Sequence, residues 1–168
     1  MPEEHIGVGM IGCGRIFDLH MRGYEGRDDA AVMAVADINE ESRNKQAEQY
    51  GITRHYADYR ELLEDRDIDL VEILTPHHLH REMALAAAQA GKHISLQKPP
   101  ALTVGEFDEV VEAAEKAGVT LRVFENFVFY PPIVKAKELI QEGAIGQPLN
   151  IRMRSVTGSA AGGWEVPL

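Results

Sequence analysis

The chain has 168 residues, 45% of them hydrophobic, which is enough to bury one core and to begin a second domain. Its 17 Lys and Arg residues against 27 Asp and Glu give a net charge of -10, which repels nucleic-acid phosphates and anionic lipids. We therefore expect no nucleic acid and no membrane among its partners. A single cysteine excludes an internal disulfide, and no apolar run reaches spanning length, so the sequence predicts a cytoplasmic protein.

The first apolar segment of the chain breaks at the turn Gly12-Cys13-Gly14. Between a strand and a helix, such a turn brings backbone N–H groups to the pyrophosphate of a dinucleotide, beside the helix N-terminus. An overlapping match to the glycine motif of dinucleotide-binding turns starts at Gly7. It would put its glycines inside the strand, so we discard it. The third small position of the G-x-G-x-x-G/A motif falls on Phe17, which makes the match imperfect. We interpret Cys13 as a small residue in a variable slot and not as a reactive thiol.

Strand-like and helix-like segments alternate along most of the chain. The strand-like segments are residues 6–11, 31–36, 53–56, 70–74, 93–96 and 119–124. The clearest helix-like segments are residues 39–50, 79–90 and 103–117. This alternation predicts an α/β fold, a Rossmann doubly wound parallel sheet that gathers ligands at the carboxyl ends of its strands.

The pattern changes after Asn126, so we expect a Rossmann domain over residues 1–126. A helix opens at Pro131, and residues 149–156 alternate as a strand with one solvated face. Residues 127–168 therefore predict the start of an α+β open-sheet domain that the chain does not complete. Because an unpaired strand needs a partner, we expect a homo-oligomer formed through this C-terminal sheet.

Asp37 ends the second predicted strand, about 20 residues after the glycine turn, where a carboxylate accepts hydrogen bonds from a ribose diol. The alternative is an aspartate that simply leads the next helix. The preceding glycine turn favours the ribose role. A carboxylate here repels a 2′-phosphate, so NAD is the expected cofactor and NADP is less favoured.

The turn Thr75-Pro76-His77 follows the fourth predicted strand and is expected to border the nicotinamide half of the cofactor. With His78 and His80, the turn also invites a metal-site interpretation. Neighbouring side chains diverge on a strand-to-helix turn, however, and no nearby Cys or carboxylate pair completes a ligand shell. We therefore expect no metal.

Lys98 follows Gln97 at the end of the fifth predicted strand, on the same edge. A lysine there can orient a substrate hydroxyl and favour its alkoxide character during hydride removal. A solvated lysine before a proline-terminated strand is the plainer alternative.

A series of motifs decides between these alternatives. In chain order they are Gly12-x-Gly14 to His20, Ala36-Asp37, Thr75-Pro76-His77-His78-Leu79-His80, Gly91-Lys92-His93, Lys98-Pro99 and Asn126-Phe127-Val128-Phe129-Tyr130-Pro131. Together they resemble the glucose-fructose oxidoreductase and inositol dehydrogenase family, written Gfo/Idh/MocA, over essentially the whole chain. The resemblance implies NAD(P)-dependent oxidation or reduction of a sugar, polyol or derivative, with Lys98 matching the catalytic lysine of the family's Glu-Lys-Pro motif.

The expected cofactor-binding residues come from these same motifs. They are Gly12, Gly14, Arg15, Ile16, Asp37, Thr75, Pro76, His77, His80, Gln97, Lys98 and Asn126. Gln97 departs from the family's usual glutamate, Phe17 from its usual small residue and Val128 from a common arginine. The Asp and His that partner the lysine in the family lie further along than this chain extends.

The sequence thus predicts an NAD(P)-dependent oxidoreductase, represented by its cofactor domain and part of a second domain. We expect the 168-residue chain alone to bind NAD without turning over substrate. The alternative is a non-catalytic dinucleotide-binding module or sensor, and an Asp-x-x-x-His-like motif beyond Leu168 would favour the enzyme.

Overall fold

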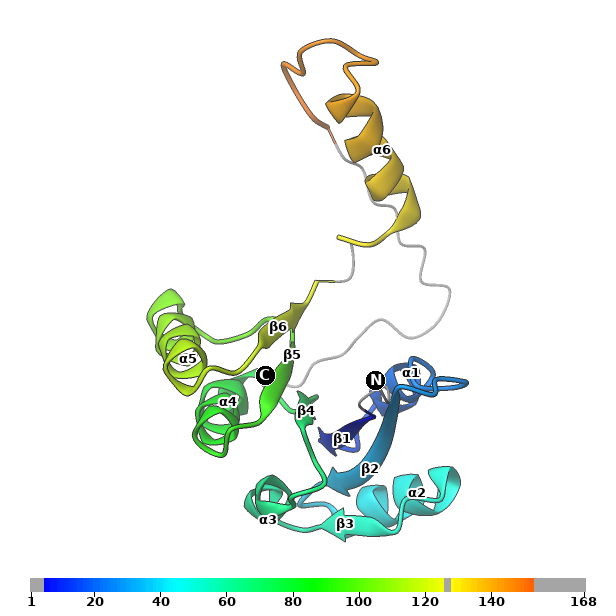
Figure 1. The fold of residues 1–168 in the computed structure, drawn as a ribbon, viewed down its shortest axis with the longest axis vertical. Helices are drawn as coiled ribbons and strands as arrows, with labels where there is room; N and C mark the ends of the chain where they lie inside the picture. Colours follow the sequence, from blue (N-terminus) through cyan, green and yellow to red (C-terminus); the bar gives the residue numbers. More distant parts are fainter. Residues whose placement is uncertain (1–4, 126–127, 153–168) are drawn as a thin grey trace. The chain divides into compact units, whose positions relative to one another are not determined.

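Six strands form one parallel sheet in the order β3-β2-β1-β4-β5-β6 (Figure 1). The structure, a computed structural model, describes residues 5–125 and 128–152. The strands are β1 (Ile6–Ile11), β2 (Ala30–Ala36), β3 (Arg54–Tyr56), β4 (Leu70–Ile73), β5 (His93–Gln97) and β6 (Leu121–Phe124). The helices are α1 (Phe17–Met21), α2 (Glu40–Tyr50), α3 (Tyr59–Glu64), the 3₁₀ helix η1 (His77–Leu79), α4 (His80–Gln89), α5 (Val104–Ala117) and α6 (Pro131–Gln141). This strand order is that of the Rossmann fold, so the predicted fold class is confirmed for the first domain.

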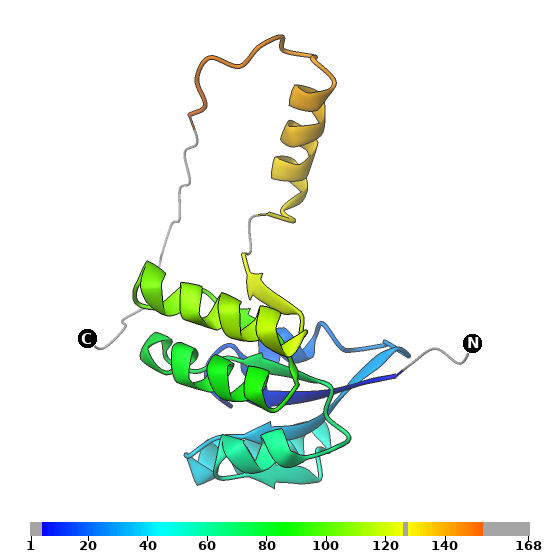
Figure 2. The ribbon, with the colours of Figure 1, turned by 60° about the vertical axis from the view of Figure 1, so that its left-hand side comes forward.

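Helices cover both faces of the sheet, as its apolar strands require. On one face α3, α4 and α5 pack on a large core whose buried members include Leu62, Ala84 and Val110. Figure 2 shows α4 and α5 running side by side over this face. On the other face α1 and α2 enclose a smaller core that includes Phe17 and Ala47.

Helix α3 is absent from the sequence analysis because it has only six residues, too few for a clear period. Its first turn is capped by Asp58, whose side chain accepts a hydrogen bond from the Arg60 backbone N–H. The glycines inside β1 allow this helix to pack closely: a Cβ at Gly9 would lie 2.6 Å from a methyl group of Leu62. The glycine that we set aside as part of a misplaced motif therefore has a packing role.

Phe17, the large residue in the glycine motif, is completely buried in the smaller core. Its ring lies 5.9 Å from the ring of Tyr50, centroid to centroid, in a tilted contact. The side chain thus packs against α2 and the sheet.

The chain divides into two compact units, Met1–Glu125 and Asn126–Leu168. In the second unit α6 begins at Pro131, as predicted, and carries no buried residue. The predicted strand at 149–156 is wrong for residues 149–152, which form no strand, and its remaining residues lie outside the described part of the chain. Pro148 directly precedes this segment and supplies no backbone N–H for a sheet.

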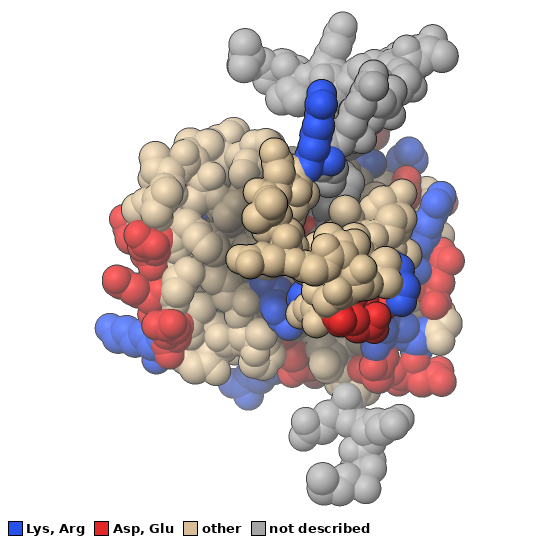
Figure 3. Space-filling model, turned by 90° about the horizontal axis from the view of Figure 1, so that it is seen from above, with Lys and Arg blue, Asp and Glu red and all other residues tan. Residues whose placement is uncertain are grey.

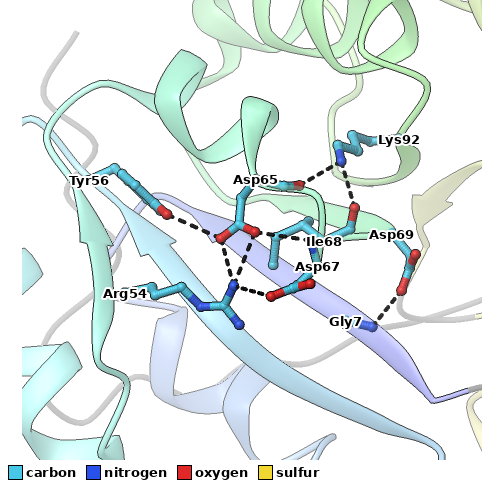
Figure 4. A network of polar contacts seen from close by, with 8 residues as sticks. All are labelled: Gly7, Arg54, Tyr56, Asp65, Asp67, Ile68, Asp69 and Lys92. Atoms are coloured by element: carbon cyan, nitrogen blue, oxygen red, sulfur yellow. Dashed lines mark hydrogen bonds and ion pairs between the residues drawn. The ribbon is translucent and has the colours of Figure 1, made fainter.

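A polar network lies where β3, β4 and β5 begin (Figure 4). Asp65 accepts hydrogen bonds from Arg54 at 2.9 Å and from the Tyr56 hydroxyl at 3.1 Å. Lys92 donates from Nζ to the backbone oxygens of Asp65 and Ile68, at 2.8 and 2.7 Å. The network therefore fixes the connections that lead into β4 and β5.

The charged side chains outside this network are mostly exposed. On the face shown in Figure 3, acidic and basic side chains are interspersed. In the described part of the chain, no helix is long and apolar enough to cross a membrane.

The network around Asp65 predicts a pH-dependent loss of stability. Burial raises the pKa of Asp65, but the Asp67 backbone N–H, Tyr56 and Arg54 favour its charged form, so the pKa lies below its usual value. Replacement Asp65→Asn should therefore lower the free energy of unfolding by about 1–3 kcal/mol at neutral pH, measured by denaturant titration.

This difference should shrink as the pH falls below about 4, because the contribution of a carboxyl group with a lowered pKa is complete above the unfolded-state pKa and is lost as the pH falls through the lower folded-state pKa. The matched control is Asp67→Asn, since Asp67 also pairs with Arg54 but its side chain is 69% exposed. Equal losses for the two variants would contradict this interpretation.

Candidate functional site

The carboxyl ends of β1, β2, β4 and β5 meet at one edge because the strands are parallel. At this edge β1 lies between β2 and β4, so successive strands are added on opposite sides of β1. Ligands of open α/β sheets bind at such a switch point. Most of the residues that the sequence analysis selected follow these four strands.

Gly12 lets the end of β1 approach the end of β4. Its φ of 105° lies in a region that side chains disfavour, and a Cβ there would lie 3.0 Å from the carbonyl carbon of Leu74. Gly14 differs, because a Cβ at that position would contact nothing within 4 Å. The packing of the protein itself thus explains Gly12, whereas the space beside Gly14 suits the close approach of a ligand to backbone.

Asp37 ties this turn to the end of β2. One carboxylate oxygen accepts a hydrogen bond from the Cys13 backbone N–H at 2.7 Å, and the other accepts one from Asn39 at 2.8 Å. Arg43 donates to the backbone oxygen of Asp37 at 2.7 Å. A carboxylate has about four lone-pair sites, so Asp37 can accept further hydrogen bonds from a diol while it holds the turn.

A cavity of about 460 Å³ lies between the turns that follow β1, β2 and β4. Its lining includes five of the predicted residues: Gly12, Gly14, Asp37, Thr75 and Pro76. The structure therefore brings the glycine turn, the acid and the turn after β4 together around one space.

Apolar side chains form most of the remaining walls of this cavity, among them Ile38, Leu79 and Met83, and Asn39 and His78 add polar groups. An apolar slot suits a flat base, and a carboxylate at its edge suits the hydroxyls of a ribose. The residues present thus fit the adenosine half of a dinucleotide.

Other predicted residues lie outside the lining of the cavity. Arg15 and His77 are exposed and directly follow lining residues in the chain. Ile16 is half-buried against the smaller core, where its backbone oxygen accepts hydrogen bonds from the first turn of α1. The predicted contact at Asn126 lies outside the described residues.

His80 does not line the cavity, and its predicted contact with a cofactor stays a prediction. The side chain is fully buried, and its two ring nitrogens lie 2.8 Å from the backbone oxygens of Pro99 and Thr75. Burial lowers the pKa of His80, while the two carbonyl groups act in the opposite direction. The residue thus links the turn after β4 to the turn after β5.

Lys98, the predicted catalytic residue, is exposed at the end of β5 and does not line the cavity. Its backbone N–H donates to the Gln97 side-chain oxygen at 2.8 Å. Because β5 lies beside β4, Lys98 lies one strand further from Asp37 than the turn that follows β4.

The sequence analysis missed a buried polar cluster beneath Lys98. Glu72, only 1% exposed within β4, accepts hydrogen bonds from His20 at 2.9 Å and from the Tyr24 hydroxyl at 3.3 Å. Burial and the neighbouring Glu72 raise the pKa of Tyr24. Gln97 reaches His20 from β5 at 3.1 Å. A glutamate inside an apolar strand was the signal, since a buried charge requires partners.

The histidines near the turn after β4 do not assemble a metal site. The rings of His77 and His80 lie 5.7 Å apart in a T-shaped contact. Within residues 5–125 and 128–152, no three His, Cys, Asp or Glu side chains are grouped as metal ligands.

The strand order, the glycine turn and the acid after β2 define a dinucleotide-binding domain. The chain belongs to the Gfo/Idh/MocA oxidoreductase family with an NAD-binding Rossmann fold, whose family model matches residues 6–125. This result confirms the family resemblance found in the sequence.

Two relatives illustrate the range of the family. The chain is 34% identical over 148 residues to a myo-inositol 2-dehydrogenase of Thermotoga maritima, covering 88% of this chain and 44% of the relative. It is 37% identical over 139 residues to a D-apiose dehydrogenase of Paraburkholderia graminis, covering 83% and 37%. The chain thus spans less than half the length of these curated relatives.

Solved structures show the same fold. A probable dehydrogenase from Thermotoga maritima superposes with a TM-score of 0.82 at 34% identity, over 85% of this chain and 43% of the other. An oxidoreductase from Agrobacterium radiobacter, in complex with NAD+, L-tartaric acid and magnesium, gives 0.82 at 30% identity, over 86% and 42%.

The site predicts an unreactive thiol at Cys13. Burial and the nearby Asp37 raise the pKa of Cys13 to about 12, against a weaker opposite effect of Arg43. At about pH 8 the folded chain should react very slowly with a thiol-reactive disulfide reagent, followed by absorbance, and the denatured chain should react fully. Rapid, complete modification of the folded chain would show that the turn opens or that the thiolate is stabilised.

Proposed function

We propose that the protein containing this chain is an NAD-dependent dehydrogenase of a sugar, polyol or derivative, and that this chain provides its cofactor domain. The observation that carries the proposal is the shared cavity of Asp37 and the Gly12–Gly14 turn. The names of the relatives, an inositol and an apiose dehydrogenase, support a polyhydroxylated substrate. Fold alone would not support a substrate class.

NAD is preferred to NADP in this proposal because of Asp37. Its carboxylate lies at the cavity and is already held in place by two backbone N–H groups. It can accept hydrogen bonds from an unmodified ribose, whereas a 2′-phosphate would place a second anion beside it.

The chemistry divides between the cofactor and the protein. When bound, NAD supplies hydride exchange at C4 of its nicotinamide ring. Asp37 and the glycine turn orient the adenosine and pyrophosphate groups. Lys98 donates a hydrogen bond to the reacting hydroxyl of the substrate and favours its alkoxide form. The proposal assigns the final proton acceptor to a residue outside the described ranges.

Residues 127–168 would begin the substrate domain, and copies of the protein would associate through it in the cytoplasm. Two observations support the second domain and its association. The chain spans less than half the length of its relatives, and α6 exposes Ile133, Val134 and Leu139 along its length. An amphipathic helix of this kind normally covers a core.

The first prediction from this proposal concerns cofactor choice. Calorimetric titration should find NADH binding at least about tenfold more tightly than NADPH, a difference of about 1.4 kcal/mol. Replacement Asp37→Asn removes the charge and should narrow this ratio. The control Glu41→Gln makes the same charge change at an exposed position in the first turn of α2 and should leave the ratio unchanged. Equal affinities in the parent protein would refute the NAD assignment.

The second prediction concerns Lys98. In the full gene product that contains this chain, Lys98→Met should lower kcat about a hundredfold with a sugar or polyol substrate, because the hydroxyl loses its charged partner. The affinity for NAD should change little, since Lys98 lies outside the adenosine cavity. The control Lys116→Met removes an exposed lysine of α5 and should leave kcat unchanged. An unaltered kcat in Lys98→Met would remove this lysine from the mechanism.

A further inference from the structure

The polar cluster beneath Lys98 connects three separate parts of the fold. His20 comes from α1, Glu72 from β4 and Gln97 from β5, and the side chain of His20 is only 10% exposed. The ring of Phe124, at the end of β6, contacts the His20 ring edge-on at 4.8 Å between centroids. The imidazole is therefore held in one position from several sides.

The backbone N–H of Lys98 determines which atom donates and which accepts in each hydrogen bond from Lys98 to Glu72. The Lys98 backbone N–H can only donate, so the Gln97 oxygen accepts it at 2.8 Å. The Gln97 amide nitrogen must then donate to Nε2 of His20, which lies 3.1 Å away. His20 Nε2 is consequently unprotonated, and its Nδ1–H donates to Glu72 at 2.9 Å.

We propose that His20 is a positioning residue for Lys98: its neutral Nδ1–H tautomer holds the Gln97 amide in the orientation that receives the Lys98 backbone N–H. The proposal rests on the role assigned to Lys98 above. The Glu72 carboxylate holds the proton on Nδ1 of His20, and the unprotonated Nε2 of His20 orients the Gln97 amide. The Gln97 oxygen then fixes the backbone position from which the Lys98 side chain extends.

A proton on Nε2 of His20 would face the Gln97 amide hydrogens. The amide would then have to rotate by half a turn, and its oxygen would leave the Lys98 N–H. The charged and titratable groups that meet at His20 are Glu72 from β4 and, through Glu72, Tyr24. The carboxylate that faces Nδ1 and the amide nitrogen that faces Nε2 thus determine which ring nitrogen of His20 carries the proton.

The first test measures the tautomer directly. Nitrogen-15 NMR of the full gene product should show His20 with a protonated Nδ1 and an unprotonated Nε2 at neutral pH. Replacement Gln97→Glu converts the facing donor into an acceptor, so the Nε2 signal should shift towards the protonated form. A protonated Nε2 in the parent protein, or an Nε2 signal unmoved by Gln97→Glu, would overturn the proposal.

The second test separates positioning from stability with two variants of His20. In His20→Asn the amide nitrogen occupies the place of Nδ1, so Glu72 keeps its donor but Gln97 loses its acceptor. In His20→Gln the amide oxygen occupies the place of Nε2, so Gln97 keeps its acceptor but the buried Glu72 loses its donor. We expect His20→Asn to be the more stable variant and His20→Gln the more active one.

For His20→Asn, kcat should fall about tenfold while KM for NAD stays within about twofold, because only the lysine is displaced. The matched control is Asp65→Asn, which weakens a buried network at the opposite edge and should lower stability without changing kcat. A purely structural His20 would make activity follow stability in all three variants, and that result would contradict the proposal.

These outcomes remain distinct from failure of the proposed function. If Lys98→Met leaves kcat unchanged, the role of Lys98 fails whatever happens at His20. If Lys98→Met lowers kcat but His20→Asn does not, the role of Lys98 stands and the positioning role of His20 is rejected.

Discussion

The contact between the ends of β1 and β4 is the constraint on which the site depends. Gly12 has a positive φ and lies so close to Leu74 that a Cβ would be 3.0 Å from a carbonyl carbon. Because the two central strands can meet there, the turns that follow them face one cavity. Any side chain at Gly12 would push these turns apart and separate the glycine turn from Thr75 and Pro76.

Asp37 adds a second constraint, because one carboxylate has two tasks. It accepts hydrogen bonds from the backbone at Cys13 and Asn39, and it lines the cavity. The shape of the turn and the proposed affinity for a ribose therefore depend on a single side chain. A change of cofactor by substitution at this residue would consequently also disturb the turn, so the neighbouring residues would have to adapt with it.

The sequence predicts the fold well because its signals are local. Alternating strand and helix patterns give the six strands, and α5 begins directly after its N-cap Thr103, where the helix-like segment 103–117 starts. The missed features depend on distant partners or on weak patterns. Glu72 and His20 are 52 residues apart, and α3 is too short to show a period. The pattern of residues 149–152 resembles a strand, but no neighbouring strand pairs with it within the described ranges.

The two ends of the parallel strands hold different groups of residues. The network of Arg54, Asp65 and Lys92 lies where the strands begin, and the cavity lies where they end. Substitutions at one end of the strands should therefore have little effect on the other end, since changes in free energy at sites without shared partners are almost additive. In evolution, such a chain can accumulate stabilising substitutions where its strands begin while the residues around the cavity change independently.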